Sequence, residues 1–309
     1  MTRVGLLSLC LCVAGAGVLG TPSAARAQKP EPLEGIALED YVRVWPPLQE
    51  CTAWLTNGDR RHATYCVDGM IHNGVASGGA NNLKAQLLRE DGNLDAAAAA
   101  IERALRLEPN QDLHHFQSGQ ISVARVALAS NPLTRWRWAE AAYASYDRAF
   151  NLDTKVYRYR KYVATHKLRA PAIGGGDKEG ALALADQGIT YGCQECYMLR
   201  GYAQFILEQF DKGFADFDKA VSLGLYDHQL LLRAGQQAVD RQDWTRADRY
   251  YRYILSRRPD SARAHFAMGS YLAKKGDAKQ AAASFEAALK LEPDHRPAAE
   301  QLAHLRAGR

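Results

Sequence analysis

Residues 231–259 read LLRAGQQAVDRQDWTRADRYYRYILSRRP, and residues 265–293 read HFAMGSYLAKKGDAKQAAASFEAALKLEP. Both segments lie in the stretch Asp227–Asp294 and repeat one pattern at a fixed interval. A fixed period of about 34 residues is typical of repeat arrays, in which each unit is one supersecondary structure. Two small residues, an aromatic residue and a proline recur in register: Gly235 and Gly269, Ala247 and Ala281, Tyr251 and Phe285, Pro259 and Pro293.

The spacing of apolar residues predicts two amphipathic helices in each unit. Apolar or small residues recur at i, i+4 and i+7, which places them on one face of a helix. Gln242-Asp243 and Gly276-Asp277 are polar turns between the helices, and proline ends each unit because it cannot continue a helix interior. The two stripes in the first unit are Leu231, Gly235 and Ala238, followed by Ala247, Tyr251 and Ile254.

This pattern resembles the tetratricopeptide repeat (TPR) family, whose unit is a pair of antiparallel helices. The resemblance covers residues 78–295, with irregular repeats over 112–153 and 154–192. It implies an all-α fold, a right-handed α-solenoid of helical hairpins, preceded here by a short N-terminal helical hairpin. It also implies a scaffold that holds a peptide or protein partner in its concave face. We expect four regions: a signal peptide (1–27), a cysteine-containing segment (28–77), the repeat array (78–295) and a C-terminal capping helix (296–309).

Residues 1–27 have the features of a secretory signal peptide. Arg3 precedes an apolar run from Val4 to Gly20, and Ala25-Arg26-Ala27 is an A-x-A-like cleavage site. The alternative is an uncleaved transmembrane anchor, for which the run is short. Cleavage removes two of the 39 basic residues and none of the 34 acidic ones, which leaves a net charge of +3. So mild a charge does not indicate nucleic-acid binding, and export implies a periplasmic protein.

Four cysteines remain after cleavage. Cys51 and Cys66 flank an Asn57-Gly58-Asp59 turn between helices expected at 48–56 and 60–71, so an antiparallel hairpin brings them together. Export makes a disulfide available, and buried free thiols are the alternative. Cys193 and Cys196 stand at a helix start. They suit a structural disulfide, free thiols, or a redox or metal-binding pair.

Between helices expected at 113–129 and 136–151, the array carries an insertion of roughly ten residues that contains Arg135-Trp136-Arg137-Trp138. Trp and Arg suit membrane interfaces, but the favoured interpretation is that both rings cover the helix pair while the arginines stay solvated. We likewise interpret the basic and aromatic run at 156–162 as an amphipathic helix rather than a nucleic-acid site.

The chain lacks the nucleophile-elbow, zinc-protease, dinucleotide and phosphate-loop motifs. Its nine histidines are scattered. We therefore expect a protein that is not an enzyme, with no catalytic, cofactor-binding or metal-binding residues and no small-molecule substrate.

Helical geometry predicts where a partner binds. A stripe three residues before, and one and four residues after, the small residue of each first helix lies on one face. By resemblance to TPR arrays this face lines the groove. We expect it to present mainly apolar anchors for a partner: Met198, Tyr202, Phe205, Leu232, Gln236, Phe266 and Ser270. Two other functions stay open, a thiol-redox protein using Cys193 and Cys196, and a purely structural subunit of an envelope complex.

The signal peptide gives the first prediction. Because the cleavage site ends at Ala27, we expect the mature protein to begin at Gln28 and to be found in the periplasm. N-terminal sequencing of the purified native protein measures this directly. Recovery of Met1 on soluble cytoplasmic protein would contradict it.

Overall fold

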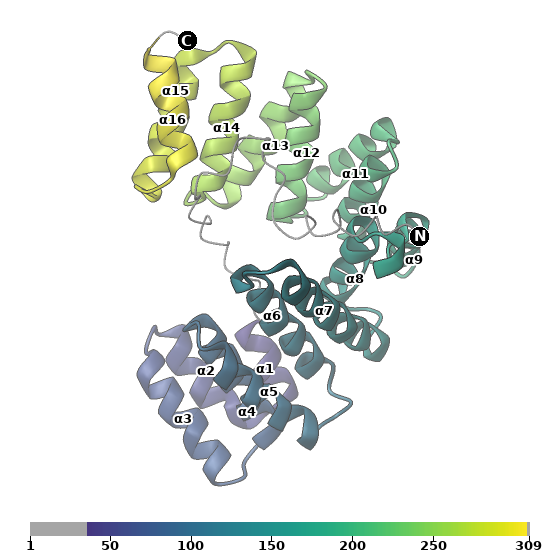
Figure 1. Ribbon diagram of the computed structural model, residues 1–309, viewed down its shortest axis with the longest axis vertical. Helices are drawn as coiled ribbons and strands as arrows, with labels where there is room; N and C mark the ends of the chain where they lie inside the picture. The colour runs from purple at the N-terminus through teal and green to yellow at the C-terminus, as the bar shows by residue number, and fades with distance from the viewer. Residues whose placement is uncertain (1–35, 308–309) are drawn as a thin grey trace, which may run out of the picture. The chain divides into compact units, whose positions relative to one another are not determined.

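The computed structural model describes residues 36–307, and the predicted signal peptide lies outside them. Within this range the chain forms sixteen α-helices, two 3-10 turns and no strand, which confirms the all-α fold (Figure 1). The chain divides into two compact units, residues 1–177 and 178–309, and the boundary falls inside the predicted array.

The first unit consists of helical hairpins in chain order. In it, α2 pairs with α3, α4 with α5, and α6 with α7. The helices are α1 (Leu38–Val44), α2 (Gln49–Thr56), α3 (Arg60–His72), α4 (Ser77–Glu90), α5 (Leu94–Leu107), α6 (Asp112–Leu128), α7 (Pro132–Leu152) and α8 (Tyr157–Arg169), with 3-10 turns η1 (Pro46–Leu48) and η2 (Ala172–Gly174).

The second unit continues the pattern. In it, α10 pairs with α11, α12 with α13, and α14 with α15, and α16 packs on α15 as the predicted capping helix. Its helices are α9 (Lys178–Thr190), α10 (Cys196–Ile206), α11 (Phe210–Ser222), α12 (His228–Asp240), α13 (Trp244–Arg257), α14 (Ala262–Lys275), α15 (Ala278–Leu291) and α16 (Arg296–Arg306).

Each regular hairpin closes where a glycine of the first helix faces an aromatic ring of the second. A Cβ placed on Gly235 would lie 2.6 Å from the Tyr251 ring, closer than real side-chain contacts allow. Because glycine has no side chain, the two helix backbones can approach until only one aromatic ring separates them. The same arrangement recurs in four hairpins: Gly119 with Tyr146, Gly201 with Phe217, Gly235 with Tyr251, and Gly269 with Phe285.

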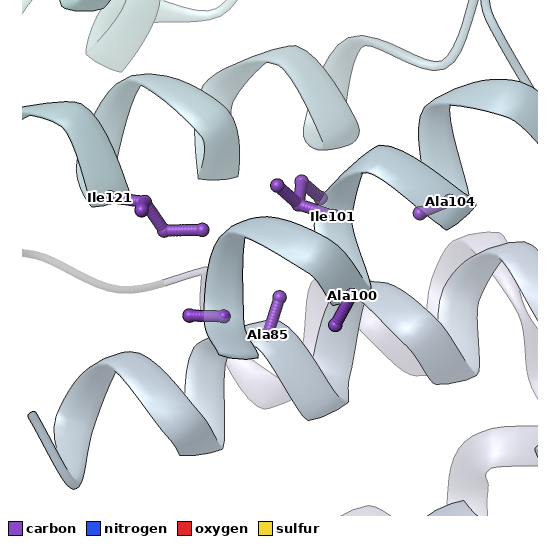
Figure 2. Close-up of a cluster of buried hydrophobic side chains, with 6 residues drawn as sticks. Ala85, Ala100, Ile101, Ala104 and Ile121 are labelled. Atoms are coloured by element: carbon purple, nitrogen blue, oxygen red, sulfur yellow. The ribbon is translucent and has the colours of Figure 1, made fainter. Parts of the chain in front are cut away.

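Alanine takes the place of glycine in the hairpin of α4 and α5. Its buried core lies between these helices and α6, and Figure 2 shows the small side chains that allow the three backbones to come close. Ala97 and Ile101 of α5 belong to this core. The full cluster is Ala85, Ala97, Ala100, Ile101, Ala104 and Ile121.

The polar turns act as helix caps, as expected for residues whose side-chain oxygens accept hydrogen bonds from the first backbone N–H groups of a helix. The Asp243 carboxylate accepts from the backbone N–H of Arg246 and caps α13. Asp277 does the same for α15, accepting from Gln280. Asn93 caps α5 in the first unit.

The expected inter-helix insertion is helical, which corrects the predicted start of this helix at residue 136. Helix α7 begins at Pro132, a residue suited to the first helical turn, and the Asn131 side chain caps it by accepting from the Thr134 N–H. The extra residues therefore lengthen α7 to 21 residues. Trp138 lies under the Arg125 guanidinium, whereas Trp136 is 43% exposed, so only one of the two rings covers the helix pair.

Both cysteine pairs lie at disulfide distance. The Sγ atoms of Cys51 and Cys66 are 2.08 Å apart, across the hairpin of α2 and α3. Those of Cys193 and Cys196 are 2.09 Å apart at the start of α10. Within residues 36–307, no helix is both long enough and apolar enough to cross a membrane.

Two glycine substitutions test the contact between Gly235 and the Tyr251 ring. Gly235→Ala should destabilise the protein by about 1–3 kcal/mol, because its methyl group overlaps the Tyr251 ring. Gly69 is the matched control: it is also helical, in α3, but nothing lies within 4 Å of its Cβ position. Gly69→Ala should stabilise by about 0.5–1 kcal/mol through helix propensity. Urea unfolding measures both, and equal effects of the two substitutions would refute this account.

Candidate functional site

The predicted groove residues lie on α10, α12 and α14, the first helices of the three hairpins in the second unit. These helices contact one another in succession and form the inner layer of this unit. Most of the predicted apolar side chains are buried rather than open to solvent. Met198 is fully buried, Tyr202, Phe205 and Leu232 are 5–7% exposed, Phe266 and Ser270 are half-buried, and Gln236 is exposed.

Phe205 faces its own hairpin, which corrects its assignment to the groove. Its ring lies 4.9 Å from Phe214 and 5.3 Å from Phe217, both on α11, and it covers Gly213. Phe205 lies four residues after Gly201, on the face of α10 that packs against α11, the second helix of the hairpin. Phe205 therefore belongs to the core, and we remove it from the candidate partner-binding residues.

Two other aromatic rings also contact neighbouring helices. The Arg233 guanidinium of α12 lies 5.2 Å above the Tyr202 ring of α10. Phe266 lies 5.7 Å from Phe285 and 5.0 Å from His295, the residue that caps α16. These rings hold successive helices together, which accounts for the burial of side chains that the sequence placed in a groove.

The solvent-accessible part of the inner layer is polar. We call Arg233, Gln236, Asp240, Ser270 and Lys274 the polar strip. The Gln236 amide donates to the Asp240 carboxylate at 2.7 Å, and the Lys274 ammonium lies 3.6 Å from that carboxylate. Arg233 has no carboxylate partner within residues 36–307. The strip can therefore offer donors and acceptors to a polypeptide, with one uncompensated positive charge.

Sequence analysis missed three residues of this strip, although a signal was present for two of them. Asp240 and Lys274 occupy the same position in successive repeats, as do Gln236 and Ser270. Continuing the pattern one helical turn beyond Gln236 and Ser270 predicts Asp240 and Lys274. Arg233 carries no such signal, because Ala267 takes its position in the next repeat.

A shallow cleft of about 580 Å³ opens in the second unit beside the turn that joins α10 to α11. Arg241 covers the Phe210 ring, and Arg246 covers Phe214 while it pairs with Asp218 and Asp243. The lining also carries Glu208, Asp211 and Lys212. Acidic and basic groups balance here, so the cleft does not favour an ion of either sign.

The first unit holds a buried polar cluster that connects α1, α4 and α6. Asn82 Nδ2 lies 2.7 Å from His114 Nδ1, and His114 Nε2 lies 3.2 Å from the Glu108 carboxylate. The Tyr41 hydroxyl lies 2.9 Å from Asn82 Oδ1. The Trp45 ring stacks on His114 at 5.2 Å. Sequence analysis did not identify this cluster, because its members stand far apart in the chain.

His114 is neutral in this cluster. Burial, with a smaller contribution from the charge of His115, lowers the pKa of its imidazole to about 3. The contacts agree with this assignment, because Nδ1 accepts from the Asn82 amide and Nε2–H donates to Glu108. The cluster thus acts as a hydrogen-bonded structural element rather than a proton donor at neutral pH.

The cysteine pair at α10 has unequal exposure. Cys196 is fully buried at the start of the helix, and Cys193 is half-buried. With the two sulfur atoms joined, neither is a thiolate. Within residues 36–307, no group of three or more His, Cys, Asp or Glu side chains is placed to hold a metal ion.

Comparison with protein families agrees with the hairpin geometry. Two models described as tetratricopeptide repeat match the chain, one over residues 79–111 and the other over residues 232–299. The chain contains tetratricopeptide repeats (TPRs) over these two segments.

Known proteins resemble parts of this TPR chain. It is 34% identical over 118 residues to the human protein O-mannosyl-transferase TMTC1, a match that covers 37% of this chain and 13% of that protein. Among solved structures, PilW, described as a widely conserved type IV pilus biogenesis factor, has a TM-score of 0.53 at 14% identity, with 73% of this chain and 98% of PilW covered. The human IFIT1 dimer with m7Gppp-AAAA has a TM-score of 0.51 at 15% identity, with 83% and 57% covered. At these identities the likeness to both structures concerns the fold.

His114 gives a prediction for pH dependence. Its pKa is lower in the folded protein than the ordinary value of about 6.5, so its contribution to stability is complete above pH 6.5. As the pH falls from 6.5 toward 3, the unfolded state binds a proton that the folded state does not, and stability decreases by about 1.4 kcal/mol per pH unit.

Urea unfolding at pH 7, 5.5 and 4.5 measures this loss. His114→Gln is the control, because it keeps a neutral polar side chain that does not titrate, and its stability should fall less over the same range. Identical pH profiles for the two proteins would show that His114 is not held neutral.

Proposed function

We propose that this protein is an exported, non-catalytic TPR scaffold of the periplasm that binds a peptide or protein partner on the inner layer of its second unit. TPR proteins bind protein or peptide partners, and the repeated hairpins give this chain the same kind of surface. The observation that carries the assignment to the second unit is the polar strip. Its side chains come from consecutive repeats and remain accessible while the apolar residues around them are buried.

The polar groups of the strip indicate the chemistry of the expected partner. Apolar anchors were expected from the sequence, but Met198 and Leu232 are buried, so a partner meets mainly amide, hydroxyl and charged groups. Hydrogen bonds to a polypeptide, together with the positive charge of Arg233, favour a polar segment with acidic character. Phe266 is half-buried beside the strip and offers one aromatic contact.

A thiol-redox role is a second candidate that one observation favours. Cys193 is the more accessible member of a pair whose other member is buried at a helix start, and a helix N-terminus lowers the pKa of a thiol. A thiol–disulfide exchange assay on native protein separates this role from a structural bond. A structural subunit of an envelope complex is the other alternative, which would show as stable co-purification with a large assembly.

Site-specific photo-crosslinking in the native envelope tests the scaffold proposal. A photoreactive amino acid at position 236 lies on the strip, whereas one at position 252 lies on α13, where the Arg252 side chain is 62% exposed. We expect irradiation to give a discrete crosslinked protein from position 236 and none from position 252, identified by mass spectrometry.

A crosslinked protein obtained from position 252 alone would place binding on the other face of the unit and overturn the assignment. Crosslinks to nucleic acid would contradict the expected partner class. Fractionation of the same cells tests the periplasmic location, because the protein should be released with the soluble envelope contents.

A further inference from the structure

Residues Ile36–Trp45, here called the strap, lie against the inner helices of the first unit in a way that resembles a bound peptide. The strap has extended backbone at Ala37 and continues as the short helix α1. Three of its residues are buried: Ile36 is 2% exposed, Tyr41 0% and Trp45 7%. The partners of the strap lie 41 to 118 residues away in the chain, so the contacts are tertiary rather than local.

The backbone of the strap is held by a side-chain amide. Gln86 Oε1 accepts from the Ile36 N–H at 3.2 Å, and Gln86 Nε2 donates to the Ile36 carbonyl at 3.3 Å. This two-way pairing satisfies both polar groups of one residue, as a neighbouring strand would. Both bonds are made by the backbone of Ile36 and not by its side chain.

The side chains of the strap fix its register at three further points. The Tyr41 hydroxyl lies between Asn82 and Gln86, and the Trp45 indole N–H donates to the Glu108 carboxylate at 3.1 Å. The Asp40 carboxylate accepts from Arg158 at 2.7 Å. The Trp45 ring lies directly on the α4 backbone, since a Cβ at Gly79 would be 2.3 Å from it. Only glycine at that position leaves room for the indole.

The inner layer offers more hydrogen-bonding capacity than the strap uses. Gln120 stands one repeat period after Gln86, at the same position of the next hairpin. Gln117 lies one turn before it on α6. Both side chains are fully buried, and neither amide has a hydrogen-bond partner within residues 36–307. Buried amides without partners are rare and costly, so these two side chains retain unused hydrogen-bonding capacity.

We infer that the inner layer of the first unit is a polypeptide-binding site whose resident ligand is the strap. The ligand class is a segment with an extended start, followed by one helical stretch that carries Tyr and, four residues later, Trp. A free segment with this pattern can replace the strap. This site lies in the first unit and does not depend on the function proposed for the second.

Binding of the strap sequence in trans tests the inference. The full mature chain with Tyr41→Ala and Trp45→Ala keeps Gln86, Asn82, His114 and Glu108 but loses the anchors that hold the strap in place. The probe is a fluorescein-labelled synthetic peptide, EGIALEDYVRVWP, which corresponds to residues 34–46. Fluorescence anisotropy should show that it binds this variant at least tenfold more tightly than wild type, in which the site is filled.

Two matched controls establish recognition. The same peptide with alanine in place of its Tyr and Trp should bind the variant at least tenfold more weakly. Adding Gln86→Ala to the variant should also weaken the native peptide. A Kd weaker than about 1 mM for a variant whose circular dichroism retains the helices would overturn the inference. Equal affinity for the native and alanine peptides would overturn it as well.

A second measurement tests the inference if the double variant does not fold. Tyr41→Phe removes only the hydroxyl group and should leave the unit folded. With excess probe peptide, hydrogen exchange of the strap amides over residues 36–44 should become faster, because the free peptide displaces the strap. Exchange that is unchanged by the peptide would show that the strap is a fixed part of the fold and that no site exists beneath it.

Discussion

The contact on which this fold depends is that of a helix backbone with an aromatic ring. In four hairpins, the first helix carries a glycine at the point where a Tyr or Phe ring of the second helix lies against its backbone. Van der Waals attraction falls off steeply with distance. A side-chain atom added at the glycine would therefore push the two helices apart and weaken the contacts along their length. The hairpin of α4 and α5 has no such ring and packs closely through a core that is mostly alanine.

Because packing fixes the hairpins so tightly, the variation between units lies on the inner layer. The first unit has amides and a histidine there, and covers them with its own residues 36–45. The second unit has buried aromatic and aliphatic side chains beneath a thin row of polar groups. The same backbone arrangement therefore supports two chemically different surfaces, which is why the repeat pattern identifies the fold better than it identifies the partner.

The sequence predicted the regular parts well because a fixed period imposes the same helix pair each time. It located the hairpins, the polar turns between their helices, the final helix and both cysteine pairs. It was wrong about the start of α7, where Pro132 begins a helix instead of preceding one. It was also wrong about Phe205, whose ring packs on α11 rather than lining the groove. It could not predict the cluster around His114, because this cluster joins residues from three helices with no local pattern.

The strap also has a kinetic consequence. Contacts between successive repeats span a few tens of residues, so each hairpin can form soon after its own residues are free. The strap differs, since Ile36 bonds to a residue 50 positions later, Trp45 to one 63 positions later and Asp40 to one 118 positions later. Closing such long loops is slow relative to local helix pairing. The strap precedes all of these partners in the chain, so its residues are the last to reach their native contacts.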